Sequence, residues 1–201
     1  MRLHLVGLIV VVAWVSLLSG SLAEGIPDAE LENNIEWFGI NLGGGPLMFN
    51  LDHDDYYPLA FTRFGPQADL LLFNLNFPGW YLTPLEIHPV FFLGFLGGGT
   101  RAGVRLALSD DRRHELRLGS FAGVDGYLYH INTFAPSLVL KPHAQYLFHT
   151  SSGSIGVGVD FLLLFHFRDE MLGGDGHTVS VPPVAYGASV YLRWTIGRSA
   201  R

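Results

Sequence analysis

The chain has 201 residues, with 25 glycines, 11 prolines and no cysteine; 49% of it is hydrophobic, 13% aromatic and only 15% charged. This amount of apolar surface argues against a disordered chain. The lack of cysteine excludes disulfide scaffolds, cysteine-ligated zinc and thiol nucleophiles. Composition therefore predicts a folded domain, but it does not indicate what chemistry the domain performs.

The first segment has the pattern of a signal peptide. Met1-Arg2 supplies a basic start, an apolar run extends from Leu5 to Leu18, and Ser21-Leu22-Ala23 fits a small-x-small cleavage site. The run is shorter than the ~20 residues that a membrane-crossing helix needs. We expect residues 1–23 to be removed on export and residues 24–34 to form a short periplasmic lead. No cysteine follows the cleavage site, so no lipoprotein anchor is expected.

Removing residues 1–23 changes the charge balance only slightly. It removes one of the 12 basic residues and none of the 18 acidic ones, so the remaining formal net charge is 11 − 18 = −7. A negative chain is a poor partner for nucleic acid, because phosphate binding requires a basic face. The remaining length suits one domain.

The rest of the chain alternates apolar and polar residues with period two, as strands do. In chain order, weaker alternation covers 35–43, 67–77 and 85–96, and clear alternation covers 101–108, 114–124, 137–148, 154–167 and 187–196. These lengths are near the ~9–11 residues of a tilted membrane strand, and no later apolar run is long enough for a transmembrane helix. We predict an all-β fold: a single antiparallel up-and-down transmembrane barrel of about eight strands within residues 35–201. Pro89 and Pro142 predict local bulges, because each removes a donor from the hydrogen-bond ladder.

The face that carries the charges separates a membrane barrel from a soluble one. One face of the predicted strands is rich in leucine, valine and phenylalanine, whereas the other combines glycine and serine with charged or polar residues. These are Arg101, Arg105, Glu115, Arg117, Lys141, His143, Asp160 and Arg193. Small and charged residues suit a crowded interior, and a broad apolar face suits lipid. The pattern favours the membrane barrel, with a soluble lipocalin-like cup as the alternative.

The connections and the aromatic residues fit the same topology. With both termini in the periplasm, the predicted inner turns are 75–84, 110–113 and 149–153, and the predicted outer loops are 45–66, 97–100, 125–133 and 168–182. Three of these outer loops are longer than the short turns, as in outer-membrane barrels. Aromatic girdles are expected at both rims: Trp37, Trp80-Tyr81 and Trp194 at the periplasmic rim, and Tyr56-Tyr57 with Tyr127 and Tyr129 at the outer rim.

On these patterns, residues 33–197 resemble the small eight-stranded outer-membrane barrels of Gram-negative bacteria. The resemblance implies a porin-like protein of the cell envelope, located in the cell outer membrane, in contact with lipid and lipopolysaccharide and inserted by the barrel-assembly machinery. One feature departs from that group. Its members usually end on an aromatic residue, whereas this chain continues past Trp194 to Arg201.

The catalytic candidates are His149 and Ser151. His149-Thr150-Ser151 resembles the His-x-Ser element of outer-membrane lipid A deacylases, in which a base lies beside a hydroxyl nucleophile and a carboxylate orients the base. The nearest later carboxylate, Asp160, falls on the interior face, and His149 falls at the periplasmic end. We therefore favour the simpler interpretation, a serine- and glycine-containing turn.

The metal candidates are Asp52, Asp54 and Asp55 in the first outer loop, with a second acidic group in 169–177. Oxygen-rich loops can bind calcium or bridge cations to lipopolysaccharide. No spacing matches an EF-hand or a zincin, so we favour solvated acidic loops, and no cofactor is expected. His88, His143 and His166 are expected to be interior hydrogen-bonding groups rather than ligands.

The predicted function is a structural or adhesive role in surface interaction through loops 45–66 and 168–182, rather than an enzymatic one; the surface ligand itself stays open. Two alternatives remain: a lipid A-modifying hydrolase, and a narrow channel for small solutes. We favour a plugged interior over a conducting one, because buried charges must pair and an eight-stranded barrel has room only for side chains. Leu147, Phe121 and Tyr191 also fall on the inner face.

Overall fold

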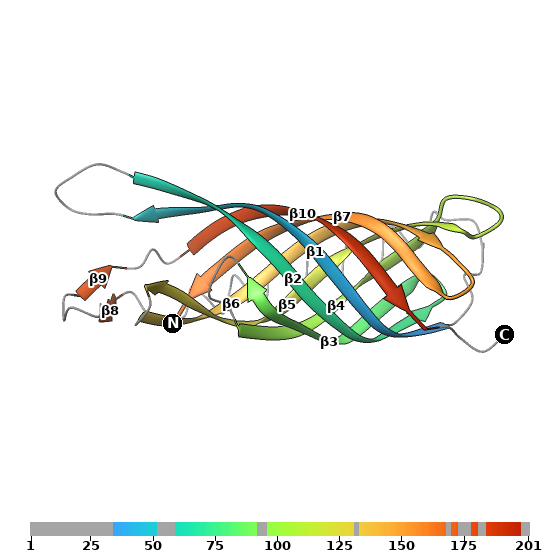
Figure 1. The fold of residues 1–201 in the computed structure, drawn as a ribbon, viewed down its shortest axis with the longest axis horizontal. Coiled ribbons are helices and arrows are strands. Elements are labelled where there is room, and N and C mark those ends of the chain that lie inside the picture. Colours follow the sequence, from blue (N-terminus) through green and yellow to red (C-terminus); the bar gives the residue numbers. More distant parts are fainter. Residues whose placement is uncertain are drawn as a thin grey trace.

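The computed structural model describes residues 34–51, 59–91, 96–130, 133–167, 170–172, 178–180 and 184–197, with side chains for 34–46, 65–89, 97–126, 136–167 and 184–197. Eight antiparallel strands form a closed barrel, shown in Figure 1. The described residues contain ten strands, of which all but β8 and β9 belong to the barrel: β1 (Asn34–Leu51), β2 (Leu59–Phe77), β3 (Trp80–Phe91), β4 (Leu96–Ala107), β5 (His114–His130), β6 (Thr133–His149), β7 (Gly153–His166), β8 (Glu170–Leu172), β9 (Thr178–Ser180) and β10 (Val184–Ile196).

Around the barrel, each strand pairs with the next barrel strand along the chain, β7 pairs with β10, and β1 pairs with β10 to close the ring. β8 and β9 form a separate two-stranded sheet between β7 and β10. The predicted all-β fold with a closed, eight-stranded antiparallel barrel is therefore confirmed. Within the described residues, no helix is long and apolar enough to cross a membrane.

The barrel has a turn end and a loop end. At the turn end, on the right in Figure 1, short connections at 78–79, 108–113 and 150–152 join the strands. The predicted turn 75–84 is wrong in extent, because β2 and β3 continue to within two residues of each other. Gly79 makes this connection possible by adopting a positive φ of 75°, which is costly for residues with a Cβ.

At the loop end, three predicted connections are wrong in extent or position. The predicted loop 125–133 is mostly strand, because β5 continues to His130 and β6 begins at Thr133. The predicted loop 45–66 is mostly paired strand, because residues 45–51 of β1 face residues 59–65 of β2. Residues 97–100 do not connect two strands but lie inside β4, between β3 and β5. The glycines there serve close packing rather than turning: a Cβ on Gly97 would lie 1.8 Å from Asp125 Oδ1. The predicted loop 168–182 contains β8 and β9.

Bulges occur where β2, β3 and β4 meet. The register between β2 and β3 shifts between Ala68 and Leu70, opposite the segment that contains Pro89, as predicted. A second shift lies between Thr83 and Glu86 of β3, against β4. The bulge predicted at Pro142 is absent: its pairing with β5 is continuous, and the register toward β7 resumes unchanged after a gap at 141–142. The missing N–H of Pro142 therefore interrupts the pairing with β7 locally but does not shift the register.

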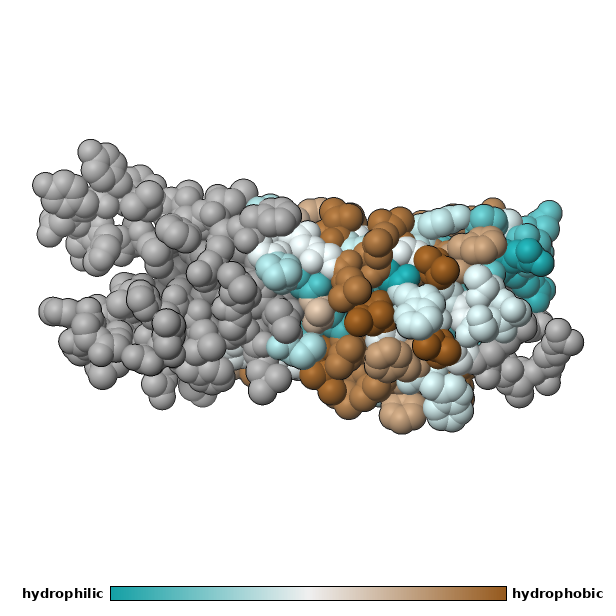
Figure 2. Space-filling view, in the orientation of Figure 1, coloured by the Kyte–Doolittle hydropathy of each residue, from teal (hydrophilic) through white to brown (hydrophobic). Residues whose placement is uncertain are grey.

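The burial pattern is the reverse of that in a water-soluble protein. Among the described side chains, 24 polar or charged residues are buried, against 11 hydrophobic ones. Many large hydrophobic side chains are exposed instead, including Leu192 at 67%, Phe161 at 61% and Val190 at 57%. Figure 2 shows hydrophobic residues as a brown band across the middle of the visible face, with hydrophilic residues at the turn end.

Aromatic residues near the turn end face both ways. Trp37, Trp80 and Trp194 lie on the outside, where the girdle was expected, each about half exposed. Tyr81 is the exception to that expectation, because it points inward and is fully buried. Its parity along β3 is opposite to that of Trp80, so the two cannot share a face. The side chains of the tyrosines expected at the other rim (56, 57, 127 and 129) lie outside the described part of the chain.

Candidate functional site

The interior of the barrel, called the lumen below, contains all eight charged or polar residues that the sequence places on the inner face. Each is at most 6% exposed. They are Arg101, Arg105, Glu115, Arg117, Lys141, His143, Asp160 and Arg193. Together with other lumen residues they form two networks, which we name by their charge. The acidic network comprises Asp69, Glu86, His88, Arg101, Asp125, Lys141 and Asp160; the basic network comprises Glu36, Arg105, Glu115, Arg117 and Arg193.

Arg101 on β4 is the centre of the acidic network. Its guanidinium donates two hydrogen bonds to Glu86 on β3, with Nε–Oε2 at 2.5 Å and Nη2–Oε1 at 2.8 Å. It donates two more to Asp160 on β7, both at 3.1 Å. Paired charge-assisted hydrogen bonds of this kind are the strongest that side chains make. Because β7 lies three strands away from β4, this single side chain ties together opposite walls of the barrel.

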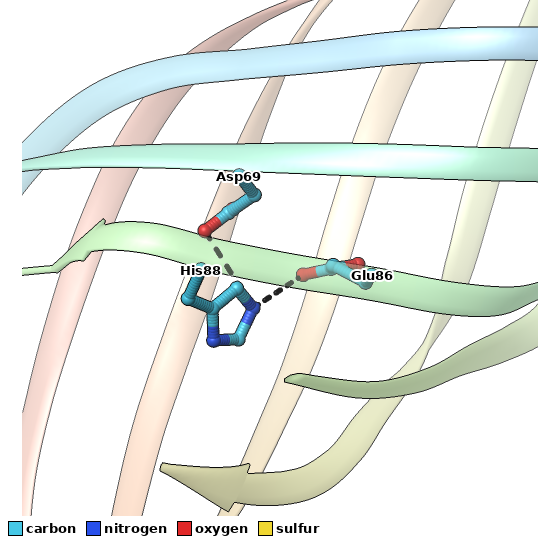
Figure 3. Close-up of side chains that lie close together, drawn as sticks. All are labelled: Asp69, Glu86 and His88. Carbon is cyan, nitrogen blue, oxygen red and sulfur yellow. Dashed lines mark hydrogen bonds and ion pairs between the residues drawn. The ribbon is translucent and has the colours of Figure 1, made fainter. Parts of the chain in front are cut away.

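His88 lies beside this arginine, on the same face of β3 as Glu86. Its Nδ1 is 3.1 Å from both carboxylate oxygens of Asp125 on β5. Its Nε2 is 3.0 Å from Glu86 Oε1 and 3.6 Å from Asp69 Oδ1, as Figure 3 shows. All four side chains are fully buried. The imidazole therefore lies among three carboxylates.

Lys141 on β6 adds a positive charge to this group. Its Nζ is 3.0 Å from His88 Nε2 and 3.7 Å from Asp69 Oδ1. The other oxygen of Asp69 accepts hydrogen bonds from Gln67 at 2.6 Å and from Asn41 at 3.3 Å. Oδ1 of Asp69 is buried and has no hydrogen-bond partner. The lysine and the histidine thus face the same carboxylate oxygen.

The nitrogen of His88 and one oxygen each from Asp69 and Glu86 lie within 4.8 Å of one another, which makes this group able to hold a metal ion. The candidates from the sequence, Asp52, Asp54 and Asp55, lie outside the described residues, as do Asp169, Asp175 and His177. The structure therefore brings together a possible ligand set that the sequence analysis did not predict, and it includes a histidine that was expected only to form hydrogen bonds.

The basic network lies nearer the turn end, with Glu115 at its centre. Oε1 of Glu115 accepts hydrogen bonds from Arg105 Nε at 3.0 Å and Arg117 Nε at 2.5 Å. Oε2 accepts from Arg105 Nη2 at 2.7 Å and lies 2.8 Å from His149 Nε2. One carboxylate thus holds two guanidinium groups and an imidazole.

Arg193 and Glu36 complete the basic network. Arg193 donates to Gln145 at 3.2 Å and to Asn74 at 3.1 Å, and Glu36 accepts from Ser154 at 2.8 Å. Several buried atoms here have no hydrogen-bond partner: Glu36 Oε2, Arg193 Nε, Gln145 Nε2, Asn74 Nδ2 and both Nη atoms of Arg117. Buried polar groups left in this way are usually satisfied by water.

The two networks carry opposite charge. In the acidic one, two cations (Arg101 and Lys141) face four carboxylates, which gives 2 − 4 = −2 with His88 neutral. In the basic one, three arginines face two carboxylates, which gives 3 − 2 = +1. The described lumen is therefore acidic in its middle and toward the loop end, and basic toward the turn end.

Apolar and aromatic side chains fill the space between the charges. Leu147 and Phe121 are fully buried, and Tyr191 is 1% exposed. Tyr81 is hydrogen-bonded to His143 and lies under the guanidinium of Arg117, 4.9 Å from the ring centroid. These apolar and aromatic side chains therefore share the described lumen with the charged groups.

The catalytic candidates lie at the turn end. His149 is the last residue of β6, and the carboxylate at its Nε2 is Glu115, not Asp160, which is bound to Arg101. Ser151 is exposed in the 150–152 turn. The sequence analysis missed Glu115 as the partner of His149, because the two residues are distant in the chain and meet only through the pairing of β5 with β6.

The lumen carboxylates that sequence reasoning missed are Glu36, Asp69, Glu86 and Asp125. Glu86 and His88 are two residues apart, so their shared face was a usable signal within the weakly predicted strand 85–96. Asp125 follows directly on the predicted strand 114–124 and keeps its parity, so a longer strand would have included it.

No protein-family model, curated protein or solved structure matches this chain.

Proposed function

We propose that the chain is an integral barrel protein of a Gram-negative outer membrane, exported by residues 1–23, with a structural or adhesive role in surface interaction at its loop end. The observation that carries the proposal is the reversed burial: a lumen lined with charges inside an outer face of exposed hydrophobic side chains. A soluble ligand-binding cup would have the apolar residues inside. In lipid, the apolar outer face is the favourable arrangement.

The height of the apolar surface supports this environment. Along β7, the outward-facing residues Ile155, Val157, Val159 and Phe161 are all apolar, and the series continues through Leu163 to Phe165. At ~3.3 Å per residue and a tilt of ~40°, the distance from Ile155 to Phe165 along the barrel axis is about 25 Å. This matches the ~25 Å apolar band of outer-membrane barrels.

The packing of the lumen favours a rigid platform over a channel. Arg101 spans the lumen between Glu86 and Asp160, and Phe121 and Leu147 are fully buried beside the charged groups. Ion flow would require these side chains to separate. The proposed protein is therefore a closed barrel that presents its loop end.

The loop end supports a role in contact. β1 and β2 have 18 and 19 residues, well beyond the ~9–11 that a membrane strand needs. Figure 1 shows their hairpin and the β8–β9 sheet extending at the left, past the end of β3. We propose that these projecting parts of 45–66 and 168–182 contact surface ligands, while lipopolysaccharide contacts the barrel wall and the barrel-assembly machinery inserts it.

The hydrolase alternative is less favoured by the geometry. The Glu115–His149 pair lies at the turn end, which the orientation proposed here would put in the periplasm, and the substrate of a lipid A deacylase lies in the outer leaflet. Glu115 also accepts hydrogen bonds from Arg105 and Arg117. Two guanidinium groups therefore balance its negative charge, which leaves less of it to stabilise a protonated His149.

The first experiment tests the membrane barrel. The chain from residue 24 is refolded into detergent and lipid vesicles and run on gels with and without boiling. We expect a mobility shift on boiling, and strands that resist protease in vesicles. A soluble periplasmic protein without that shift would refute the proposal.

The second experiment tests the surface role. Cells that display the wild-type chain are compared with cells in which residues 52–58 or 173–177 are replaced by Gly-Ser linkers of equal length, and adherence and self-aggregation are measured. Replacement of turn residues 150–152 is the matched control. We expect the loop replacements alone to reduce adherence. Equal adherence of all four strains would refute the role, and release of fatty acid from lipid A would support the hydrolase instead.

A further inference from the structure

We propose that Asp69, Glu86 and His88 form a binding site for one divalent transition-metal ion, with Zn²⁺ as the reference ion, and that the ammonium group of Lys141 competes for the same position. The site lies inside the acidic network and joins β2 to β3. It rests on lumen contacts alone, so it stands or falls separately from the role proposed for the loops.

The positions of the ligand atoms suit a metal. Zinc binds histidine nitrogen and carboxylate oxygen at ~2.0–2.2 Å, so two ligands in a tetrahedral site lie about 3.3 Å apart. His88 Nε2 is 3.0 Å from Glu86 Oε1 and 3.6 Å from Asp69 Oδ1. One imidazole nitrogen with two carboxylate oxygens favours zinc and its transition-metal neighbours over calcium and magnesium, which prefer oxygen ligands alone.

The hydrogen bonding of His88 provides a separate argument. Asp125 accepts from Nδ1, the outer contact that commonly orients a metal-binding histidine and directs the lone pair of Nε2 toward the metal. At Nε2, a carboxylate oxygen of Glu86 and the ammonium of Lys141 both lie at 3.0 Å. If Nε2 carries a lone pair, it can accept a hydrogen bond from Lys141 but repels the carboxylate of Glu86. If Nε2 carries a hydrogen, it can donate to Glu86 but repels the ammonium of Lys141. A metal bound between Nε2 and Glu86 removes this conflict.

Asp69 and the overall charge point to the same ligand. Asp69 Oδ1 is fully buried without a hydrogen bond and faces His88 Nε2. Burying an unsatisfied carboxylate oxygen is unfavourable unless a cation balances it. The acidic network has a formal charge of −2, four carboxylates against two cations, and one divalent ion would neutralise it.

Lys141 already places a monovalent cation near this position, 3.0 Å from His88 and 3.7 Å from Asp69. A metal must displace this ammonium, so we infer that the lysine lowers the metal affinity. His88 lies three residues before the end of β3 at Phe91, so the loop end is the shorter route of entry. Gly97 gives Asp125 its place beside the histidine, because a Cβ there would lie 1.8 Å from Asp125 Oδ1.

The test measures zinc on the full folded chain. Each protein is refolded in detergent, checked by its mobility shift, and dialysed against buffered Zn²⁺; zinc per chain is then counted and the Kd obtained by chelator competition. We expect one zinc per wild-type chain. Lys141→Met should bind at least about 10-fold more tightly. Asp125→Asn should bind about 10–100-fold more weakly, as changes in such outer contacts do. His88→Gln should lose the site.

The matched control is His166→Gln, which alters another buried lumen histidine, one whose Nδ1 lies 2.6 Å from Ser137 Oγ. It should keep the wild-type affinity. Zinc retained at full affinity by folded His88→Gln would overturn the proposal, as would Lys141→Met that binds no better than wild type. Zinc lost only when Asp52, Asp54 and Asp55 are replaced by asparagine would also overturn it, because the ion would then belong to the first loop.

Discussion

Replacing Arg101 with methionine is the sharpest perturbation of the lumen. The substitution keeps much of the side-chain volume but removes the positive charge between Glu86 and Asp160. Two carboxylates, at most 1% exposed, then face each other without their shared partner. We expect strong destabilisation of the barrel.

The magnitude follows from four hydrogen bonds. Arg101 makes two to each carboxylate, at 2.5, 2.8, 3.1 and 3.1 Å. At ~1.5–3 kcal/mol for each hydrogen bond to a charged group, the simple sum is about 6–12 kcal/mol. Nearby groups can relax toward the orphaned carboxylates, and measured costs of breaking one buried pair are ~3–5 kcal/mol. We therefore expect the free energy of unfolding to fall by about 3–5 kcal/mol.

The assay is reversible urea unfolding of the refolded barrel in lipid vesicles. Arg113→Met is the control, because its ion pair with Asp111 is long, at 3.9 Å, and exposed; its cost should be below about 0.5 kcal/mol. A triple variant, R101M with E86Q and D160N, should recover at least half of the lost stability, since it removes the orphaned charges too. A cost below about 1 kcal/mol for the single variant, or no recovery in the triple, would refute this reasoning.

Two further predictions concern the outer surface and the turn end. Val190→Arg, near the centre of the apolar face, should lower the free energy of unfolding in vesicles by about 2–4 kcal/mol, and Leu108→Arg at the rim by about 0–1 kcal/mol; equal small costs would indicate that water, not lipid, surrounds the barrel. In the 108–113 turn, hydrogen bonds from Ser109 Oγ at 2.5 Å and from the backbone N–H of Arg113 lower the pKa of Asp111 below its ordinary value of 3.8. Ser109→Ala should raise that pKa in an NMR titration. Because the folded pKa is depressed, the contribution of this turn to stability is present above pH 3.8 and is lost on acidification through the folded pKa. If Ser109→Ala leaves the titration midpoint of Asp111 unchanged, the hydrogen bond from Ser109 does not lower this pKa.

The strands that the sequence predicts best are those with unbroken parity. Residues 114–124, 137–148, 154–167 and 187–196 alternate without interruption, and β5, β6, β7 and β10 keep a constant register over these segments. Period-two alternation therefore predicted the inner face of the charged side chains in these segments correctly, whereas Leu140, predicted on the outer face, is buried at 4% exposed. Arg117 and Asp160 were placed in the lumen for this reason.

The first three strands could not be treated in this way, because bulges change parity within them. Phe73 has a positive φ of 57°, and the strand faces inward at both Leu71 and Asn74, on either side of two residues that face outward. The register of β3 shifts twice, beside Ala68 and after Thr83. A strict alternation cannot be followed across such points. For this reason Glu36, Asp69 and Glu86, all on β1–β3, were missed.

The predicted ends of several strands were also wrong, and these errors have one cause. Glycine runs and polar residues indicate turns when only local sequence is considered. Here Gly97–Gly99 lie inside β4, and Gly43–Gly45 lie inside β1, where neighbouring strands approach too closely for a Cβ. Close approach depends on which strand lies alongside, and that information is not local.

The division of the lumen into two networks connects the proposals. Arg101 donates to both oxygens of Glu86, to Oε2 at 2.5 Å and to Oε1 at 2.8 Å, and the same Oε1 lies 3.0 Å from His88. One carboxylate therefore serves both the ion pair that closes the lumen and the site proposed for zinc. Gln67 makes a similar link, because its Nε2 donates a hydrogen bond to Asp160 and another to Asp69. A cation at His88 would act on the same side chains that hold β3, β4 and β7 together, so its first effect should be on the rigidity of the barrel rather than on any chemistry at the loops.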